Sequence, residues 1–136
     1  MLALLRALPN APNTAALLGF ELLEVRQRER QVLVGFVAKP DFTNPMGHVQ
    51  GGILTAMLDD AMAVAGVMAS GLTAAMPTIE LKVSFLRPAQ VGPLRATGEV
   101  LQLGKSVAFL AGRLHDLDGR LLASASATAM PRSLPG

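Results

Sequence analysis

The sequence predicts an α+β fold in which a curved antiparallel sheet of about five or six strands wraps one long buried helix. The segment 53–70 has apolar residues on every side of a helical wheel, as in a helix that other elements enclose. From Thr78 to Phe85, apolar residues instead alternate with polar ones, which indicates a strand. A helix that is apolar all round needs cover on most of its circumference, and a curved sheet supplies it.

The first half of the chain contains the signals for four shorter elements. Residues 1–8 are interpreted as a short helix that ends at the turn-forming 9–13 segment, and a second short helix is expected near 14–19. Two strands at 20–25 and 32–38 flank a polar hairpin. Pro40 and Asn44-Pro45 mark a loop that ends at Gly51-Gly52, where the long helix follows.

Three more strands are expected after the strand that starts at Thr78. They lie at 94–102, 106–115 and 121–130, with turns at Gly104 and at Asp118-Gly119. The whole chain, 1–136, is interpreted as one domain with its core at about 15–130. The order is two strands, one helix and four strands.

Composition predicts that copies of the chain associate. The sequence has 136 residues, of which 51% are hydrophobic and 16% are charged. A monomer of this size buries only about two thirds of the surface that its unfolded chain exposes. The apolar excess therefore favours subunit interfaces, and a homodimer or a dimer of dimers (a homotetramer) is expected.

Several classes of function are excluded or disfavoured. Without cysteine there is no disulfide, thiolate catalysis or zinc-thiolate site, which suits a cytoplasmic protein. The lack of Trp, Tyr and basic runs argues against nucleic acid. His48 and His115 lie too far apart in the sequence, without neighbouring ligands, to suggest a metal site. Asp59 and Asp60 in the middle of the apolar segment argue against a membrane span.

The strongest candidate site joins the loop before the long helix to an acidic residue inside that helix. Gly51 and Gly52 leave backbone N–H groups free at the helix start, where they could bind a carbonyl that becomes an oxyanion. Asp59 lies about 11 Å further along the helix axis, too far to share one small substrate atom with Gly51. Two helices packed antiparallel would bring Gly51 of one chain near Asp59 of the other, which predicts a site at a dimer interface.

These residues resemble the hotdog-fold acyl-CoA thioesterases, in the phenylacetate-type (PaaI-like) branch. The family pattern is Asn-x-x-Gly-x-x-His-Gly-Gly with an acidic residue nine positions after the histidine. The residues that fall in register are Asn44, Gly47, Gly51, Gly52 and Asp59. The segments 78–89 and 103–109 are similar to the family's strand ending in Arg-Pro-Ala and to its following hairpin. The resemblance covers about 15–130.

The resemblance implies a role for each matching position. Asp59 would be a general base or a nucleophile, the Gly51 N–H would polarise the thioester carbonyl, and Asn44 would help to hold the water. Thr78 falls where the family often has Ser or Thr facing the acid from across the interface. Gln50 replaces the family histidine, and an amide can donate a hydrogen bond but cannot carry a proton. His48, two positions earlier, is not assigned that part.

Substrate contacts are expected from further positions, and no cofactor is expected beyond the coenzyme A that is part of the substrate. Cations for the phosphates would be Arg87, Lys105 and Arg113, whereas Gly52, Met57, Leu58, Met62 and Phe85 would line the acyl site. Each residue also has a structural interpretation. The glycines and the asparagine could simply form turns, the methionines could belong to the core, and the threonine could be an ordinary strand residue. The cations could serve only solubility, and Asp60 is interpreted as structural. The alternatives to hydrolysis are an acyl-CoA-binding protein without turnover and an enoyl-CoA hydratase or dehydratase.

Overall fold

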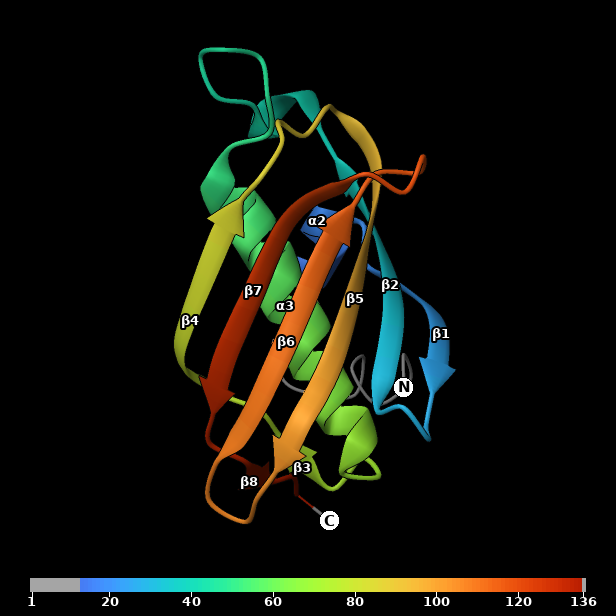
Figure 1. Ribbon diagram of the computed structural model, residues 1–136, viewed down its shortest axis with the longest axis vertical. Helices are drawn as coiled ribbons and strands as arrows, with labels where there is room; N and C mark the ends of the chain where they lie inside the picture. The colour runs from blue at the N-terminus through green and yellow to red at the C-terminus, as the bar shows by residue number, and fades with distance from the viewer. Residues whose placement is uncertain (1–12, 136) are drawn as a thin grey trace.

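The computed structural model describes residues 13–135, so the helix expected at 1–8 lies outside the described residues. The elements follow one another in the order shown in Figure 1: α2 (Asn13–Leu18), β1 (Glu21–Arg26), β2 (Gln31–Ala38), the 3-10 helix η1 (Pro40–Phe42), α3 (Gly51–Ala69), β3 (Ala74–Ala75), β4 (Thr78–Phe85), β5 (Gly92–Leu103), β6 (Ala108–His115), β7 (Leu121–Ala129) and β8 (Arg132–Ser133).

The predicted α+β architecture is confirmed. Six strands form one antiparallel sheet in the order β1-β2-β5-β6-β7-β4, and α3 runs along one of its faces (Figure 1). In this order β4, the first strand of this sheet after α3 in the chain, pairs only with β7 and is an edge strand. The return of the chain from α3 to this edge places β4 beside the helix.

Close contact between α3 and the sheet depends on two glycines. A Cβ added at Gly98 on β5 would overlap the carbonyl oxygen of Ala61, so only glycine lets strand and helix approach this far. At Gly112 on β6 an added Cβ would lie 3.0 Å from the Met62 side chain. Over this contact α3 buries its sheet-facing side, which includes Leu58 and Ala65.

The opposite side of α3 is only partly buried. Ile53, Ala56, Ala63 and Val67 lie there at intermediate exposure. In the described residues α3 is the one helix that is long and apolar enough to cross a membrane. Its sheet-facing side, however, belongs to the hydrophobic core. The segment is a core helix with one incompletely covered side.

Three short elements have no signal in the sequence. The two-residue strands β3 and β8 pair with each other and form a second, two-stranded sheet beside the end of α3. The 3-10 helix η1 forms the start of the loop that leads to α3. Segments of two or three residues are too short to show a hydrophobic period.

Candidate active site

The start of α3 leaves one backbone donor free. Gln50 caps the helix: its side-chain Oε1 accepts from the Gly52 N–H at 2.6 Å, and its carbonyl accepts from the Ile53 and Leu54 N–H groups at 2.9 and 3.2 Å. Among residues 13–135, no acceptor is found for the Gly51 N–H. Gly51 therefore presents the unpaired donor predicted at this helix start, whereas the predicted contribution of Gly52 is corrected because its N–H is used by the cap.

The loop before α3 is held in shape by Asn44. Its Oδ1 accepts from the Met46 N–H at 2.9 Å and from the His48 N–H at 3.2 Å. Its backbone N–H donates to the His48 carbonyl at 2.7 Å. Gly47 completes the turn with φ 83°, a conformation that favours glycine. The Asn44 carboxamide oxygen is thus engaged in the loop, which leaves only its amide nitrogen for a ligand.

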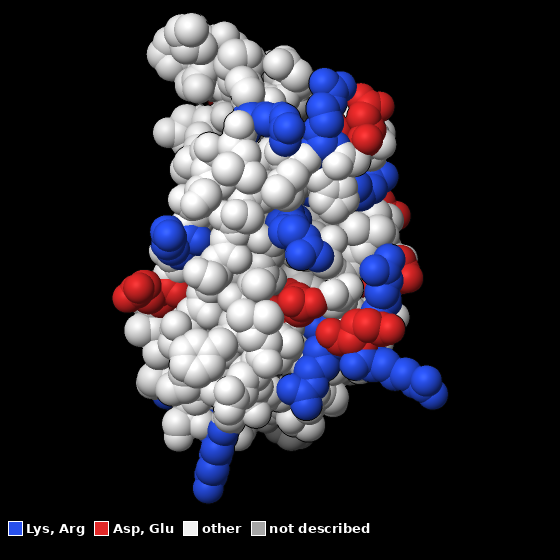
Figure 2. Space-filling model, viewed as in Figure 1, with Lys and Arg blue, Asp and Glu red and all other residues white. Residues whose placement is uncertain are grey.

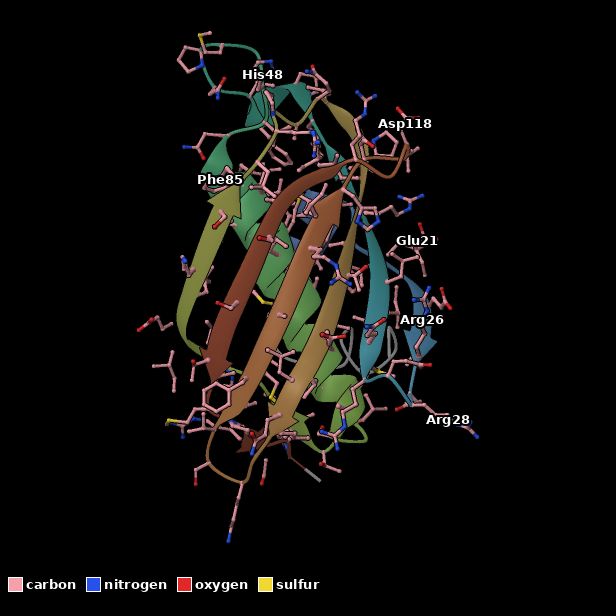
Figure 3. The ribbon with its side chains drawn as sticks, viewed as in Figure 1. Glu21, Arg26, Arg28, His48, Phe85 and Asp118 are labelled. Atoms are coloured by element: carbon pink, nitrogen blue, oxygen red, sulfur yellow. The ribbon has the colours of Figure 1, made fainter. Side chains whose placement is uncertain are left out.

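A pocket of about 410 Å³ lies between this loop and the segment after β4. It is lined by Asn44, His48, Val49, Gly51, Leu54, Phe85, Leu86, Arg87, Pro88 and Ala89. The Phe85 ring packs on Gly51, since a Cβ built there would lie 3.0 Å from the ring. His48 and Phe85 lie at the same end of the molecule in Figure 3. Four predicted site residues, Asn44, Gly51, Phe85 and Arg87, therefore share one pocket.

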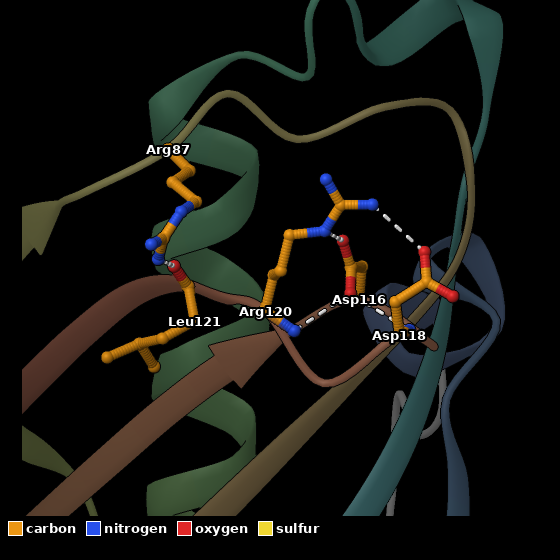
Figure 4. A network of polar contacts seen from close by, with 5 residues as sticks. All are labelled: Arg87, Asp116, Asp118, Arg120 and Leu121. Atoms are coloured by element: carbon orange, nitrogen blue, oxygen red, sulfur yellow. Dashed lines mark hydrogen bonds and ion pairs between the residues drawn. The ribbon is translucent and has the colours of Figure 1, made fainter.

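Arg87 is a cation at this pocket without an acidic partner in the described chain. Its Nη1 donates to the Leu121 carbonyl at 2.9 Å (Figure 4). In the adjacent turn, by contrast, Arg120 forms ion pairs with Asp116 at 3.4 Å and Asp118 at 3.0 Å. The charge of Arg120 is thus neutralised locally, whereas that of Arg87 remains available to an anion.

Asp59 lies further along α3 and does not line this pocket. The Thr78 hydroxyl donates to Asp59 Oδ1 at 2.6 Å, and both residues are half-buried. The bond joins α3 to β4 within one chain, so the expectation that Thr78 faces the acid from across an interface is wrong. Thr78 instead fixes one carboxylate oxygen and leaves Oδ2 free.

Asp60 differs from its neighbour. Burial, and then the charge of Asp59, raise the pKa of Asp60 to about 6. No hydrogen bond or ion pair to its side chain is found within residues 13–135. Two adjacent carboxyl groups therefore have different environments: one is bonded to a hydroxyl and the other is desolvated.

Several predicted substrate contacts lie elsewhere. Met57, Leu58 and Met62 are 0% exposed and belong to the core, so they form no acyl pocket in the chain. Lys105 lines a different pocket, beside the end of α3, together with Ser70 and Thr73.

Arg113 is also distant from the Gly51 pocket. It lies on the outer face of the sheet, because its neighbours Gly112 and Leu114 point to the core. Figure 2 shows that Lys and Arg side chains are scattered over this face among uncharged residues rather than gathered in one patch. The three expected cations are therefore not brought together in one chain.

Sequence reasoning missed most of the pocket wall. Val49, Leu54, Pro88 and Ala89 line it without having been singled out, and His48 lines it although no role was assigned to it. These residues meet because the two loops pair with each other: the Val49 N–H donates to the Ala89 carbonyl at 2.9 Å. A contact between segments that lie so far apart in the chain is not visible in local sequence patterns.

Comparison with known proteins places this geometry in a family. The sequence model of the thioesterase superfamily matches residues 46–123. A phenylacetic acid degradation-related protein of Ralstonia eutropha JMP134 superposes with a TM-score of 0.84 at 38% identity, covering 93% of this chain and 96% of that one. The medium/long-chain acyl-CoA thioesterase YigI of Salmonella typhimurium is 33% identical over 98 residues, 60% of this chain and 61% of that protein.

Two further similarities agree with this placement. A Saccharolobus solfataricus protein that is named as an esterase is 32% identical over 111 residues, 78% of this chain and 77% of that protein. The PaaI protein of the E. coli phenylacetic acid degradation operon shares the fold, with a TM-score of 0.79 at 21% identity over 93% of this chain and 87% of that one. The chain belongs to the thioesterase superfamily and is a hotdog-fold thioester hydrolase of the PaaI-like type.

Proposed function

We propose that the protein hydrolyses an acyl- or arylacyl-CoA to the free acid and coenzyme A, in an active site built by two copies of the chain. The observation that carries the proposal is the separation of the required groups along α3. An unpaired N–H lies at Gly51 beside a pocket, and a carboxylate bonded to Thr78 lies at Asp59. At 1.5 Å per residue these groups are about 11–12 Å apart in one helix, so an antiparallel partner helix is needed to unite them.

Each group then has a defined part in the reaction. The carbonyl oxygen accepts a hydrogen bond from the Gly51 N–H, which makes the carbonyl carbon more electrophilic. Asp59 removes a proton from the water that attacks this carbon, or attacks the carbon itself, while Thr78 keeps the carboxylate oriented. Asn44 can hold the water only through its amide nitrogen. The C–S bond breaks and the departing thiolate takes up the proton that Asp59 removed from the water. If Asp59 attacks the carbon itself, the thiolate takes a proton from solvent and water then hydrolyses the resulting anhydride to the free acid, so neither route requires a cofactor beyond the substrate's own coenzyme A.

Exposed apolar surface supports the second copy. The edge strand β4 exposes Ile79 at 57% and Phe85 at 54%. The partly buried side of α3, at Ile53, Ala56, Ala63 and Val67, adjoins the same carboxylates. Edge strands and apolar helix faces of this kind are normally covered. A homodimer or a dimer of dimers, in the cytoplasm, is the assembly we propose.

Two adjacent carboxylates provide a matched test. In a thiol-release assay over short-chain, medium-chain and aryl acyl-CoAs, Asp59→Asn should lower kcat by about 10²–10⁴-fold, the usual contribution of a positioned acid or base. Asp60→Asn, one position along the same helix, should keep kcat within a few-fold. Equal rates for wild type and Asp59→Asn would contradict the proposal.

Mixing two inactive variants tests the shared site. Gly51→Pro removes the N–H yet suits the first position of a helix, and Gln50, with ψ 137°, already has the conformation that precedes proline. Random re-pairing of Gly51→Pro with Asp59→Asn chains makes half of the dimers mixed, each with one intact site, so about a quarter of wild-type activity should return. A site contained in one chain would recover none.

A further inference from the structure

We propose that the His48 imidazole donates a second hydrogen bond to the thioester carbonyl oxygen, beside the Gly51 N–H. The inference rests on the proposed hydrolysis at Gly51. A carbonyl that becomes an oxyanion is commonly held by more than one donor, and each donor is worth about 10²–10³-fold in kcat.

The helix itself supplies only one donor. The Gly52 N–H is bonded to Gln50 Oε1, and the Ile53 and Leu54 N–H groups are bonded to the Gln50 carbonyl. The Gln50 side chain is exposed and does not line the pocket, so the amide that was expected to contact the carbonyl is used as a helix cap instead. A second donor must therefore come from another residue of the pocket wall.

Three lining side chains carry N–H groups: Asn44, His48 and Arg87. The Asn44 amide nitrogen is assigned to the attacking water, and the Arg87 guanidinium, which is bonded to the Leu121 carbonyl, is assigned to the phosphates. His48 is bonded to the loop only through its backbone N–H and carbonyl. Within residues 13–135 its half-buried imidazole has no partner, which leaves the ring free to meet a ligand in the Gly51 pocket.

The proposed role requires one ring N–H donor and no change of protonation. Arg87 is the one other ionisable side chain among the ten lining residues. A neutral ring still carries one N–H donor. His48 can thus hold the carbonyl oxygen without transferring a proton, and this distinguishes it from the acid-base role that a histidine could also take.

Three variants test this role, and the chain's other histidine is the matched control. His48→Ala should lower kcat by about 10²-fold with KM within a few-fold of wild type, because the donor acts on the developing oxyanion. His48→Gln keeps an N–H donor and should recover most of the lost activity. His115→Ala, on the outer face of the sheet, should match wild type. Thermal unfolding of each variant checks that the loop, which is held by backbone bonds of His48, stays folded.

The possible failures are distinguishable. If wild type releases no thiol, the proposed hydrolysis fails together with this inference. If wild type is active and His48→Ala keeps its kcat, or changes KM alone, only the role of His48 is overturned. If His48→Gln is as slow as His48→Ala, the ring acts through its proton and the donor role is also overturned.

A second measurement does not depend on turnover. In a protein with labelled histidines, a non-hydrolysable acyl-CoA ketone analogue should shift the ring resonances of His48 and leave those of His115 in place. Equal shifts for both rings, or none, would contradict the contact.

Discussion

The two chemically distinctive regions of α3 are incomplete in opposite ways. The pocket at the helix start has a free N–H, an apolar wall and a cation, but no carboxylate. The middle of the helix has two carboxyl groups and a hydroxyl, but neither carboxyl lines that pocket. Together they hold the groups that thioester hydrolysis needs, and the rigid helix keeps them apart. The association that we propose would therefore create activity as well as bury surface.

The two regions also differ in what holds them. The pocket depends on hydrogen bonds to backbone groups of a loop, including those between Asn44 and His48. Of the ten residues that line it, only His48 and Arg87 have ionisable side chains. The carboxylate region lies in the middle of α3 beside its incompletely covered side, where partial burial acts on ionisation. Changes at the helix middle should therefore affect stability and its pH dependence as well as catalysis, whereas changes at the pocket should affect the contacts to the substrate.

The largest effect on stability is expected from Asp60. Its folded-state pKa is raised from 3.8 to about 6, so its contribution to stability is present below pH 4 and is lost as the pH rises through 6. A shift of about two units corresponds to about 3 kcal/mol. Urea unfolding at fixed protein concentration should show Asp60→Asn gaining that much on wild type between pH 4 and pH 8.

The opposite slope would contradict the buried, unpaired state of Asp60. Asp118→Asn, at an exposed turn, is the control: its stability relative to wild type should change much less over the same range.

Thr78 gives a smaller effect at the same carboxylate pair. Thr78→Val keeps the shape of the side chain but removes the 2.6 Å hydrogen bond to Asp59, so the carboxylate loses its fixed orientation. We expect kcat to fall by about tenfold, close to the free energy of one hydrogen bond to a charged group. Thr78→Ser, which keeps the hydroxyl, should stay near wild type. Equal kcat values for the Val and Ser variants would show that the bond is structural only.

The fold could be predicted because the apolar residues of its long elements recur with a clear helical or strand period. The helix expected at 53–70 is observed at Gly51–Ala69, and its start was displaced because glutamine, which is not a typical cap residue, caps it. The strand that starts at Thr78 was found by alternation alone. Short pairings such as Ala74 with Ser133 depend on distant contacts and were missed.

The site was predictable only in part, for physical reasons that differ between residues. Gly51 and Asp59 were singled out by the chemistry and position of single residues, and the structure shows a free N–H at the first and a hydrogen-bonded carboxylate at the second. Met57 and Met62 were misplaced because a helix that is apolar all round does not show which side meets the sheet. Thr78 was assigned to the wrong chain because the return of β4 to the sheet edge beside α3 is a feature of topology. Arg113 could have been placed correctly, since alternation with the buried Leu114 directs it outward.

The smallest effect is expected at the pocket, from Arg87. Its guanidinium is bonded to a carbonyl oxygen rather than to an acid, so its charge can attract the phosphates of coenzyme A. Exposed charges contribute little each, about 0.2–1 kcal/mol, and Arg87→Gln should raise KM by a few-fold without changing kcat. The loss should shrink at high salt because screening weakens the attraction in wild type. Arg120→Gln, whose charge is neutralised by Asp116 and Asp118, should leave KM unchanged, and equal effects of the two variants would mean that net charge rather than the pocket attracts the substrate.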